Sequence, residues 1–360
     1  MTQLIEKLES KTRLTYEDGV KLWELDLFTL GKFADRIRRE KNGNNVFFNH
    51  NRHINPTNIC ADSCKFCAFS ANRKNPNAYE MTHEEILEQV RAAVARGVKE
   101  FHIVSAHSPN KSWQWYLEIF RLIKSEFPQA HIKALTAAEV DFLSRKFGFS
   151  YEELIDKMIE YGVDSMPGGG AEIFDEQVRR RICGGKVGSK EWLQIHALWH
   201  AKGRQSNATM LFGHLESREN RVDHILRLRA VQDESLKRGN GGGFNAFIPL
   251  VFQRQNNYLK VEGVLGSEEI LKTFAVARIL LDNFTHIKSY WATTTLNLAL
   301  VAQNFGADDL DGTIEVESIQ SAAGAKSRGG VSVKEFIDLI QTSGFTAVER
   351  DSLYNVVTTY

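Results

Sequence analysis

The amino-acid sequence predicts an α/β protein, a (β/α)8 barrel of the TIM type with an N-terminal helical extension. Two observations lead to this fold class. From residue 46 onward, short β-branched or apolar runs alternate with longer stretches of helical periodicity, the pattern of parallel βα units. The sequence holds eight such runs, the number of strands that closes a barrel of this type.

The N-terminal region predicts helices. Leucine and phenylalanine recur at helical spacing between Leu22 and Ile37, and Lys41-Asn42-Gly43-Asn44 is a stop signal. We therefore expect residues 1–44 to form the helical extension and residues 45–360 to form the barrel, with a C-terminal helix.

The barrel elements follow in chain order. The expected strands are 52–55, 101–105, 131–135, 164–166, 207–212, 244–251, 286–290 and 309–314. The expected helices are 82–96, 113–126, 151–161, 190–202, 221–237, 267–283, 296–305 and 332–342. Thr82 and Glu85 have the spacing of an N-terminal capping box, which supports the first of these helices.

A barrel of this type carries its functional groups at the carboxyl ends of its strands. Gly168-Gly169-Gly170 follows an expected strand and is therefore expected at the catalytic face. The glycine-rich run 239–243 precedes a strand and is expected at the opposite face, as a flexible turn.

Three of the four cysteines fall within eight positions. Cys60, Cys64 and Cys67 have the spacing C-x3-C-x2-C, so that one loop can bring three thiolates to one metal site. Structural zinc usually has four protein ligands, whereas a cubane iron-sulfur cluster on three cysteines leaves one iron open. The alternatives are a closed zinc site with His53 or Asp62 as fourth ligand, or three ordinary buried thiols.

The cysteine loop resembles the signature of the radical S-adenosylmethionine (SAM) superfamily, C-x3-C-x-aromatic-C, with Phe66 at the aromatic position. The resemblance implies one 4Fe-4S cluster on Cys60, Cys64 and Cys67. In that family SAM chelates the open iron, and an electron from the reduced cluster cleaves SAM to a 5'-deoxyadenosyl radical.

Polar residues at the other strand ends are the expected SAM contacts. We expect the cofactor-binding set to be Phe66, Ser105, His107, Gly169, Gly170, Glu172, Asn207 and Thr209. We expect the catalytic set to be Glu172, His214 and Asp311. For the loop residues after the second, third and fourth strands, the alternative is that they cap the following helix.

Three further features predict no chemistry. His196 and His200 share a helix face, but Ala197 follows His196, so there is no H-E-x-x-H zinc motif. Cys183 has no partner nearby in the sequence and is expected to be an inert thiol. Residues 179–181, three consecutive arginines, are expected on a solvated face.

Composition excludes several function classes. Of 360 residues, 45 are basic and 45 acidic, so no global field favours nucleic acid or a membrane surface. The first 23 residues resemble neither a signal peptide nor a transit peptide. Few cysteines and an oxygen-sensitive cluster favour a reducing compartment, and we expect a cytoplasmic protein.

Beyond the cysteine loop, the chain resembles the radical SAM subgroup that holds aminofutalosine synthase, cyclic dehypoxanthinylfutalosine synthase and the deazaflavin (F420) cofactor synthases. The stretches that carry this resemblance are 64–69, 168–173, 209–214 and 321–325. Residues 247–252 and 306–313 are most similar to the aminofutalosine synthases.

This resemblance implies a reaction of menaquinone biosynthesis. The adenosyl radical adds to the enolpyruvyl double bond of 3-(1-carboxyvinyloxy)benzoate, and rearrangement with loss of bicarbonate gives aminofutalosine. It also implies SAM as a consumed co-substrate and a reductant such as flavodoxin or ferredoxin. The substrate is an aromatic dicarboxylate, for which Arg218, Arg254, Lys288 and His214 are the candidate partners.

Other functions remain open from the sequence alone. Cyclic dehypoxanthinylfutalosine synthase and the deazaflavin synthases use the radical to abstract hydrogen. A SAM-independent barrel aldolase or hydrolase would need a base such as Lys288 or Glu172. A zinc-stabilised binding module is the alternative that is not an enzyme.

Overall fold

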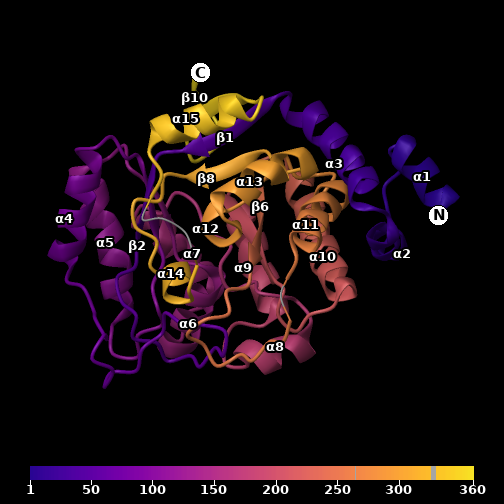
Figure 1. Ribbon diagram of the computed structural model, residues 1–360. Coiled ribbons are helices and arrows are strands. Elements are labelled where there is room, and N and C mark those ends of the chain that lie inside the picture. Colours follow the sequence, from indigo (N-terminus) through magenta and orange to yellow (C-terminus); the bar gives the residue numbers. More distant parts are fainter. Residues whose placement is uncertain (264, 326–329) are drawn as a thin grey trace.

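Parallel strand segments form a closed ring in the computed structural model, which describes residues 1–263, 265–325 and 330–360 (Figure 1). The strands of the ring are β1 (Asn45–Asn49), β2 (Asn51–Ile54), β3 (Glu100–Ile103), β4 (His131–Ala134), β5 (Gln205–Phe212), β6 (Gly243–Val251), β7 (His286–Ile287) and β8 (Asp309–Gly312). Within it, β2, β3 and β4 pair in parallel, as do β5, β6 and β7.

Isolated bridges join these sheets into a barrel. Lys133 pairs with Ser165 and Met166 with Ser206, which connects β4 to β5, and a bridge from Lys288 to β8 follows β7. Strand β8 then pairs in parallel with β1, which runs on through His50 into β2. The predicted (β/α)8 barrel is therefore confirmed.

Three features of the sheet differ from the prediction. Residues 164–166 make only isolated bridges, because the Asp164 carboxylate accepts the Ile132 N–H and Pro167 has no N–H to extend a ladder. Strand β7 has only two residues. Three strands were not predicted: β1, β9 (Thr346–Arg350) and β10 (Val356–Thr359) form a sheet with β8 in the order β10-β9-β1-β8.

Helices surround the ring, with α4 and α5 on one side and α10 and α11 on the other (Figure 1). The expected helices are found as α4 (His83–Val94), α5 (Trp113–Glu126), α7 (Tyr151–Glu160), α9 (Ser189–Ala201), α10 (Arg218–Lys237), α11 (Ser267–Leu280), α13 (Leu296–Ala302) with η2 (Gln303–Phe305), and α15 (Val333–Thr342). The short helices α6 (Ala137–Phe147), α8 (Glu176–Cys183), α12 (Trp291–Thr294) and α14 (Ile319–Ala322) were not predicted.

Three helices precede β1: α1 (Thr2–Glu9), α2 (Tyr16–Lys21), which continues into η1 (Leu22–Glu24), and α3 (Leu27–Asn42). Helix α3 packs closely against α11 and η2, since a Cβ on Gly31 would lie 2.6 Å from the Phe305 ring. The side chain of Asp26 accepts the Phe28 and Thr29 N–H groups and so caps α3. Within the described ranges, every helix is too short or too polar to cross a lipid bilayer.

Ion pairs fill part of the barrel interior below the catalytic face. Lys133 lies 3.0 Å from Glu100, Lys288 lies 2.8 Å from Asp311, and these side chains are almost fully buried. Arg350 reaches in from β9 to Asp309 at 2.6 Å. Buried charges of this kind cost desolvation energy and are tolerated only when they are paired, as they are here.

Candidate active site

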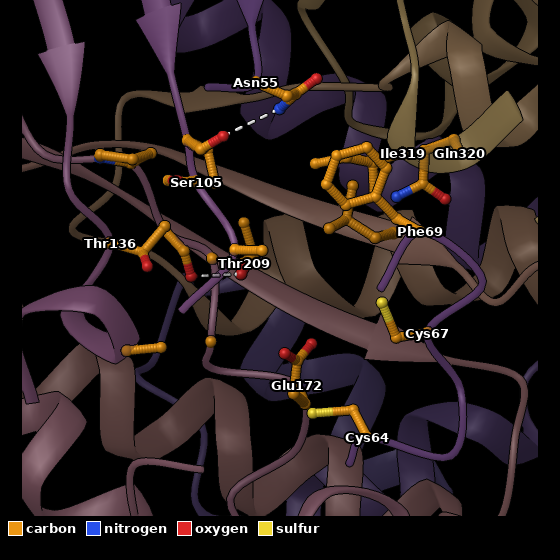
Figure 2. Close-up of a pocket in the computed structure, with 18 of the residues that line it drawn as sticks. Asn55, Cys64, Cys67, Phe69, Ser105, Thr136, Glu172, Thr209, Ile319 and Gln320 are labelled. Carbon is orange, nitrogen blue, oxygen red and sulfur yellow. Dashed lines mark hydrogen bonds between the residues drawn. The ribbon is translucent and has the colours of Figure 1, made fainter. Parts of the chain in front are cut away.

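A cavity of about 270 Å³ opens at the carboxyl ends of the barrel strands. Figure 2 shows Cys64 and Glu172 near each other, with Phe69, Ile319 and Gln320 together in another part of the site. The lining residues include 12 of the 13 predicted site residues: Cys60, Cys64, Phe66, Cys67, Ser105, His107, Gly169, Gly170, Glu172, Asn207, Thr209 and Asp311. The fold therefore brings together residues that were predicted to share one site.

Backbone hydrogen bonds hold the cysteine loop at the cavity. Ala61 N donates to His107 O at 2.8 Å, and Lys65 N donates to Ile182 O at 2.8 Å. All three cysteines line the cavity and are partly exposed to it, whereas Cys183 is buried and is not among the lining residues. Burial raises the pKa of the Cys64 thiol, and Cys183 nevertheless lies close enough to Cys64 for its charge to raise that pKa further.

The three sulfurs do not form a compact ligand group. Among the described residues, Cys60, Asp62 and His107 are the one group of three whose ligand atoms all lie within 4.8 Å of one another, so at least one pair of cysteine sulfurs is farther apart. Tetrahedral zinc, with Zn–S bonds of about 2.3 Å, needs sulfurs only about 3.8 Å apart. The sulfurs are therefore not arranged as a closed zinc site.

Asp62, one of the two predicted fourth zinc ligands, lies within 4.8 Å of the Cys60 sulfur but already has a hydrogen-bond partner. Its Oδ2 accepts from Nδ1 of His107 at 2.7 Å. Burial alone would raise the pKa of Asp62, but His107 outweighs this effect and the pKa is lowered. Burial raises the pKa of the Cys60 and Cys64 thiols, so metal binding must displace their protons.

The glycine turn at 168–170 packs directly on β5. A Cβ on Gly168 would lie 2.8 Å from the Thr209 backbone nitrogen, so only glycine allows this approach. The Thr209 hydroxyl donates to Gly168 O at 2.6 Å, as Figure 2 shows, and Trp192 Nε1 donates to Gly169 O at 3.1 Å. Backbone groups of this turn can therefore approach a ligand closely.

Glu172 follows this turn in a left-handed backbone conformation, with φ of 46°. Its carboxylate accepts a hydrogen bond from Lys186 Nζ at 2.7 Å, and Lys186 also lies over the Phe66 ring at 5.7 Å. Burial alone would raise the pKa of Glu172, but the lysine outweighs it and the pKa lies below its usual value. Glu172 is therefore held as a carboxylate.

Family models match almost the whole chain. The model of the radical SAM superfamily matches residues 54–228, and the model of the CofH/MqnC C-terminal region matches residues 241–359. The chain is 41% identical over 361 residues to an aminodeoxyfutalosine synthase of Thermus thermophilus, covering 98% of this chain and 95% of the relative. The chain belongs to the radical SAM superfamily.

Other relatives in this superfamily are also similar along their length. An aminodeoxyfutalosine synthase of Streptomyces coelicolor is 38% identical over 370 residues, covering 99% of this chain and 94% of the relative. The cyclic dehypoxanthine futalosine synthase of the same organism is 35% identical over 356 residues, covering 98% and 87%. The X-ray structure of the FeFe-hydrogenase maturase HydG from Carboxydothermus hydrogenoformans superposes with a TM-score of 0.75 at 19% identity, covering 98% of this chain and 80% of that chain, and shows the shared fold.

Radical SAM proteins hold a 4Fe-4S cluster and SAM, and this radical SAM chain offers the matching donors. Cys60, Cys64 and Cys67 would hold the cluster, since they stand in the family spacing and line the cavity. Membership of this family decides against the zinc-stabilised binding module.

Asp311 and two histidines form the floor of the radical SAM cavity. The Asp311 carboxylate accepts from Lys288 Nζ at 2.8 Å; burial opposes ionisation, but Lys288 and His53 lower the pKa of Asp311. The His53 and His102 rings meet edge to face at 4.6 Å, and burial lowers the pKa of both. His53 Nε2 and the Ser105 hydroxyl are buried without a hydrogen-bond partner among the described residues.

His214, a predicted catalytic residue, does not line the cavity. Its Nε2 is bonded to Leu211 O at 3.0 Å and its Nδ1 accepts from Leu215 N at 2.7 Å. The Glu216 carboxylate accepts the N–H groups of Gly213 and His214 and closes a tight turn. The ring nitrogens of His214 are thus engaged in local backbone contacts, and a catalytic role for His214 is not supported.

The residues predicted to bind the carboxylates of the substrate do not line the cavity either. Arg218 pairs with Glu269 at 2.6 Å, and Arg254 is not among the lining residues. Lys288 donates to Asp311 and does not line the cavity. Lys186 is therefore the one lysine or arginine of the described chain that lines the cavity, and no local sequence pattern predicts it.

The three consecutive arginines are only partly a solvated face. Arg179 is buried and donates to Gly170 O at 3.1 Å, to Ile173 O at 2.9 Å, and to Ala171 O and Val187 O. Its position three residues before Ile182 on α8 places it on the buried face of that helix. Arg179 thus stabilises the loop that carries Glu172.

Proposed function

We propose that this radical SAM chain is an aminodeoxyfutalosine synthase of menaquinone biosynthesis. It would add the 5'-deoxyadenosyl group of SAM to the enolpyruvyl double bond of 3-(1-carboxyvinyloxy)benzoate, with rearrangement and loss of bicarbonate. The full-length similarity to two aminodeoxyfutalosine synthases is the observation that carries this proposal. The cavity supports it, because cysteine donors and an apolar wall lie in one enclosed site.

The bound and reduced 4Fe-4S cluster supplies the electron that cleaves SAM. Around it, we assign SAM binding to Phe66, Ser105, His107, Gly169, Gly170, Glu172, Asn207 and Thr209, which line the cavity between the cysteine loop and β5. The charged Glu172 suits the ammonium or the ribose hydroxyls of SAM, since a carboxylate accepts charge-assisted hydrogen bonds.

The aromatic substrate is assigned to the opposite wall. Ile248 and Leu250 on β6, together with Phe69 and Tyr290, present the apolar surface of the cavity. Since Lys186 is paired with Glu172, the substrate carboxylates would meet neutral donors of the cavity lining such as Asn55 and Gln320. Neutral amides and hydroxyls can hold a buried carboxylate when several converge on it.

Asp311 would act at the floor of the site. Its side chain is fixed by Lys288 and faces the cavity from β8. A fixed carboxylate at this position can orient hydroxyl groups of the nucleoside or of the adduct. Glu172 and Asp311 would thus hold the nucleoside from two sides of the cavity.

The cyclic dehypoxanthine futalosine synthases are the second candidate, because one of them is also similar over nearly the full chain. The two functions differ in the fate of the radical: addition places the adenosine carbons in the product, whereas hydrogen abstraction releases them as 5'-deoxyadenosine.

Isotope labelling tests the proposal. The anaerobically reconstituted chain is reduced with dithionite and given SAM labelled in the adenosine carbons, with 3-(1-carboxyvinyloxy)benzoate or with dehypoxanthine futalosine. We expect label in a product of the first substrate, detected by mass spectrometry. Label found only in 5'-deoxyadenosine, with cyclisation of the second substrate, would favour the cyclase.

A further inference from the structure

In three segments of this electrically neutral chain, every charged side chain other than histidine is a lysine or an arginine. Residues 63–79, 177–190 and 253–261 contain ten lysines and arginines and no aspartate or glutamate. In a chain with 45 basic and 45 acidic residues, such segments concentrate positive charge locally. Arg179 and Lys186 are used inside the protein, but most of the others are exposed.

The fold brings these segments together at Lys65. Lys65 N donates to Ile182 O on α8 at 2.8 Å, and Lys65 O accepts from Tyr258 N at 2.8 Å and from Leu259 N at 2.9 Å. Segments far apart in the sequence therefore meet at a residue of the cysteine loop. Helix α8, which carries two of the arginines, lies at the lower edge of the molecule in Figure 1.

We name the exposed side chains at this junction the Lys65 surface: Lys65, Arg180, Arg181, Tyr258 and Lys260. None of its four cationic side chains forms an ion pair within the described part of the chain, in contrast with Arg218 or Arg91 elsewhere. The Tyr258 side chain is 83% exposed, a large aromatic group left in solvent amid these charges. Aromatic and arginine side chains are the residue types that most often anchor a protein partner.

We propose that the Lys65 surface is the docking site for a small, acidic electron-carrier protein, an inference that rests on the proposed radical SAM function. Lys65 lies between Cys64 and Cys67, so a protein bound here approaches the cysteines from outside while the cavity stays free for SAM and substrate. The bound carrier is oxidised by one electron, and the cluster held by the three cysteines is reduced by one.

Charge complementarity favours this partner. Unpaired cations attract an anionic partner over a distance of about 10 Å at 0.1 M salt, which raises the association rate without requiring a large apolar interface. Transient redox complexes have small interfaces, below about 1,200 Å², and five exposed side chains around a junction suit that size. Nucleic acid is the other anionic partner that such a surface could bind. A position beside the cysteines favours the electron carrier, because only that partner must come close to the cluster ligands.

Charge reversal away from the ligands tests the proposal. In the reconstituted holoenzyme, Arg181→Glu with Lys260→Glu is expected to weaken the binding of oxidised flavodoxin at least tenfold at low salt, measured by titration calorimetry. Product formation driven by reduced flavodoxin should fall in parallel. Product formation driven by dithionite, which needs no docking, should stay as in the unaltered chain.

The matched control is Lys32→Glu, which changes an exposed lysine of α3; this helix lies at the upper right of Figure 1, whereas α8 lies at the lower edge. It changes the net charge in the same direction and should leave flavodoxin binding within about twofold. Equal flavodoxin affinity of the double variant and the unaltered chain would overturn the proposal, as would absence of flavodoxin binding or tighter binding of a single-stranded DNA probe. Loss of dithionite-driven product in the unaltered chain would instead contradict the proposed function.

Discussion

Lys186 donates a 2.7 Å hydrogen bond to Glu172 and lies over the ring of Phe66. This one side chain therefore connects the loop after the glycine turn with the cysteine loop. Both members of the ion pair line the cavity and are largely buried, so each determines the cost of keeping the other charged.

Two variants separate the structural role of Glu172, as the partner of Lys186, from its proposed role in binding SAM. Glu172→Gln leaves Lys186 buried without a counter-charge, and we expect a loss of about 3 kcal/mol or more in the free energy of unfolding. Glu172→Gln combined with Lys186→Met removes both charges and should recover most of that stability, measured by urea unfolding. SAM affinity, measured by equilibrium dialysis, should remain weak in both variants; SAM binding as tight as in the unaltered chain would show that Glu172 does not contact it.

The cysteines offer a comparison within one residue type. Cys64→Ala removes a cluster ligand and should lose the cluster, whereas Cys183→Ala changes a buried thiol outside the cavity and should keep about four irons per chain. Iron and sulfide analysis after anaerobic reconstitution gives the measurement. Full iron content in Cys64→Ala, or zinc in place of iron in the unaltered chain, would contradict the assignment of the cluster.

The parts predictable from sequence were those with a local signal. Alternating apolar runs marked most strands, and the cysteine spacing marked the metal loop, because both depend on residues that are neighbours in the chain. Thr136 and Glu139 show the limit of local patterns. They form a capping box on α6, which their spacing can predict, but Glu139 also accepts the N–H of Ser105, which is 34 positions away in the chain.

Other parts depend on contacts that the sequence does not encode locally. Lys186 meets Glu172 only because α8 folds the chain back, and 14 positions separate the two residues. His214 follows a strand, as a catalytic residue should, yet its ring nitrogens contact the backbone of Leu211 and Leu215 and it does not line the cavity. Strand β1 was missed because asparagines at both ends resemble a loop, although β8 and β9 pair with it.

Buried histidines far from the catalytic chemistry should make stability depend on pH. His196 and His200 both hydrogen-bond to Ser206 Oγ, at 2.8 and 2.7 Å, and burial lowers the pKa of His200 to about 3. An unfolded histidine binds a proton below about pH 6.5. The folded chain therefore loses stability as the pH falls from about 6.5 toward 3, by roughly 2 kcal/mol at pH 5 for one such histidine.

The His200→Gln variant measures this contribution. Its free energy of unfolding should fall less steeply between pH 7 and pH 5 than that of the unaltered chain. The difference in slope should correspond to about one proton fewer bound on unfolding. Urea unfolding at several pH values gives the slope. Parallel curves for the two proteins would show that His200 is not the group responsible.

The glycine turn provides the last test, because two nearby glycines differ in the space around them. A Cβ on Gly168 would meet Thr209 N at 2.8 Å and the Ala208 carbonyl carbon at 2.9 Å, both in the backbone of β5. Gly168→Ala must therefore move the turn away from β5 and weaken the bond from the Thr209 hydroxyl to Gly168 O. We expect a loss of about 1–3 kcal/mol in stability, together with weaker SAM binding, since the displaced turn enters the cavity.

Gly185 has no atom within 4 Å of its Cβ position, and Gly185→Ala should stay within about 0.5 kcal/mol of the unaltered chain and bind SAM normally. Equal SAM affinity in both variants, measured by equilibrium dialysis, would remove the turn from the SAM site.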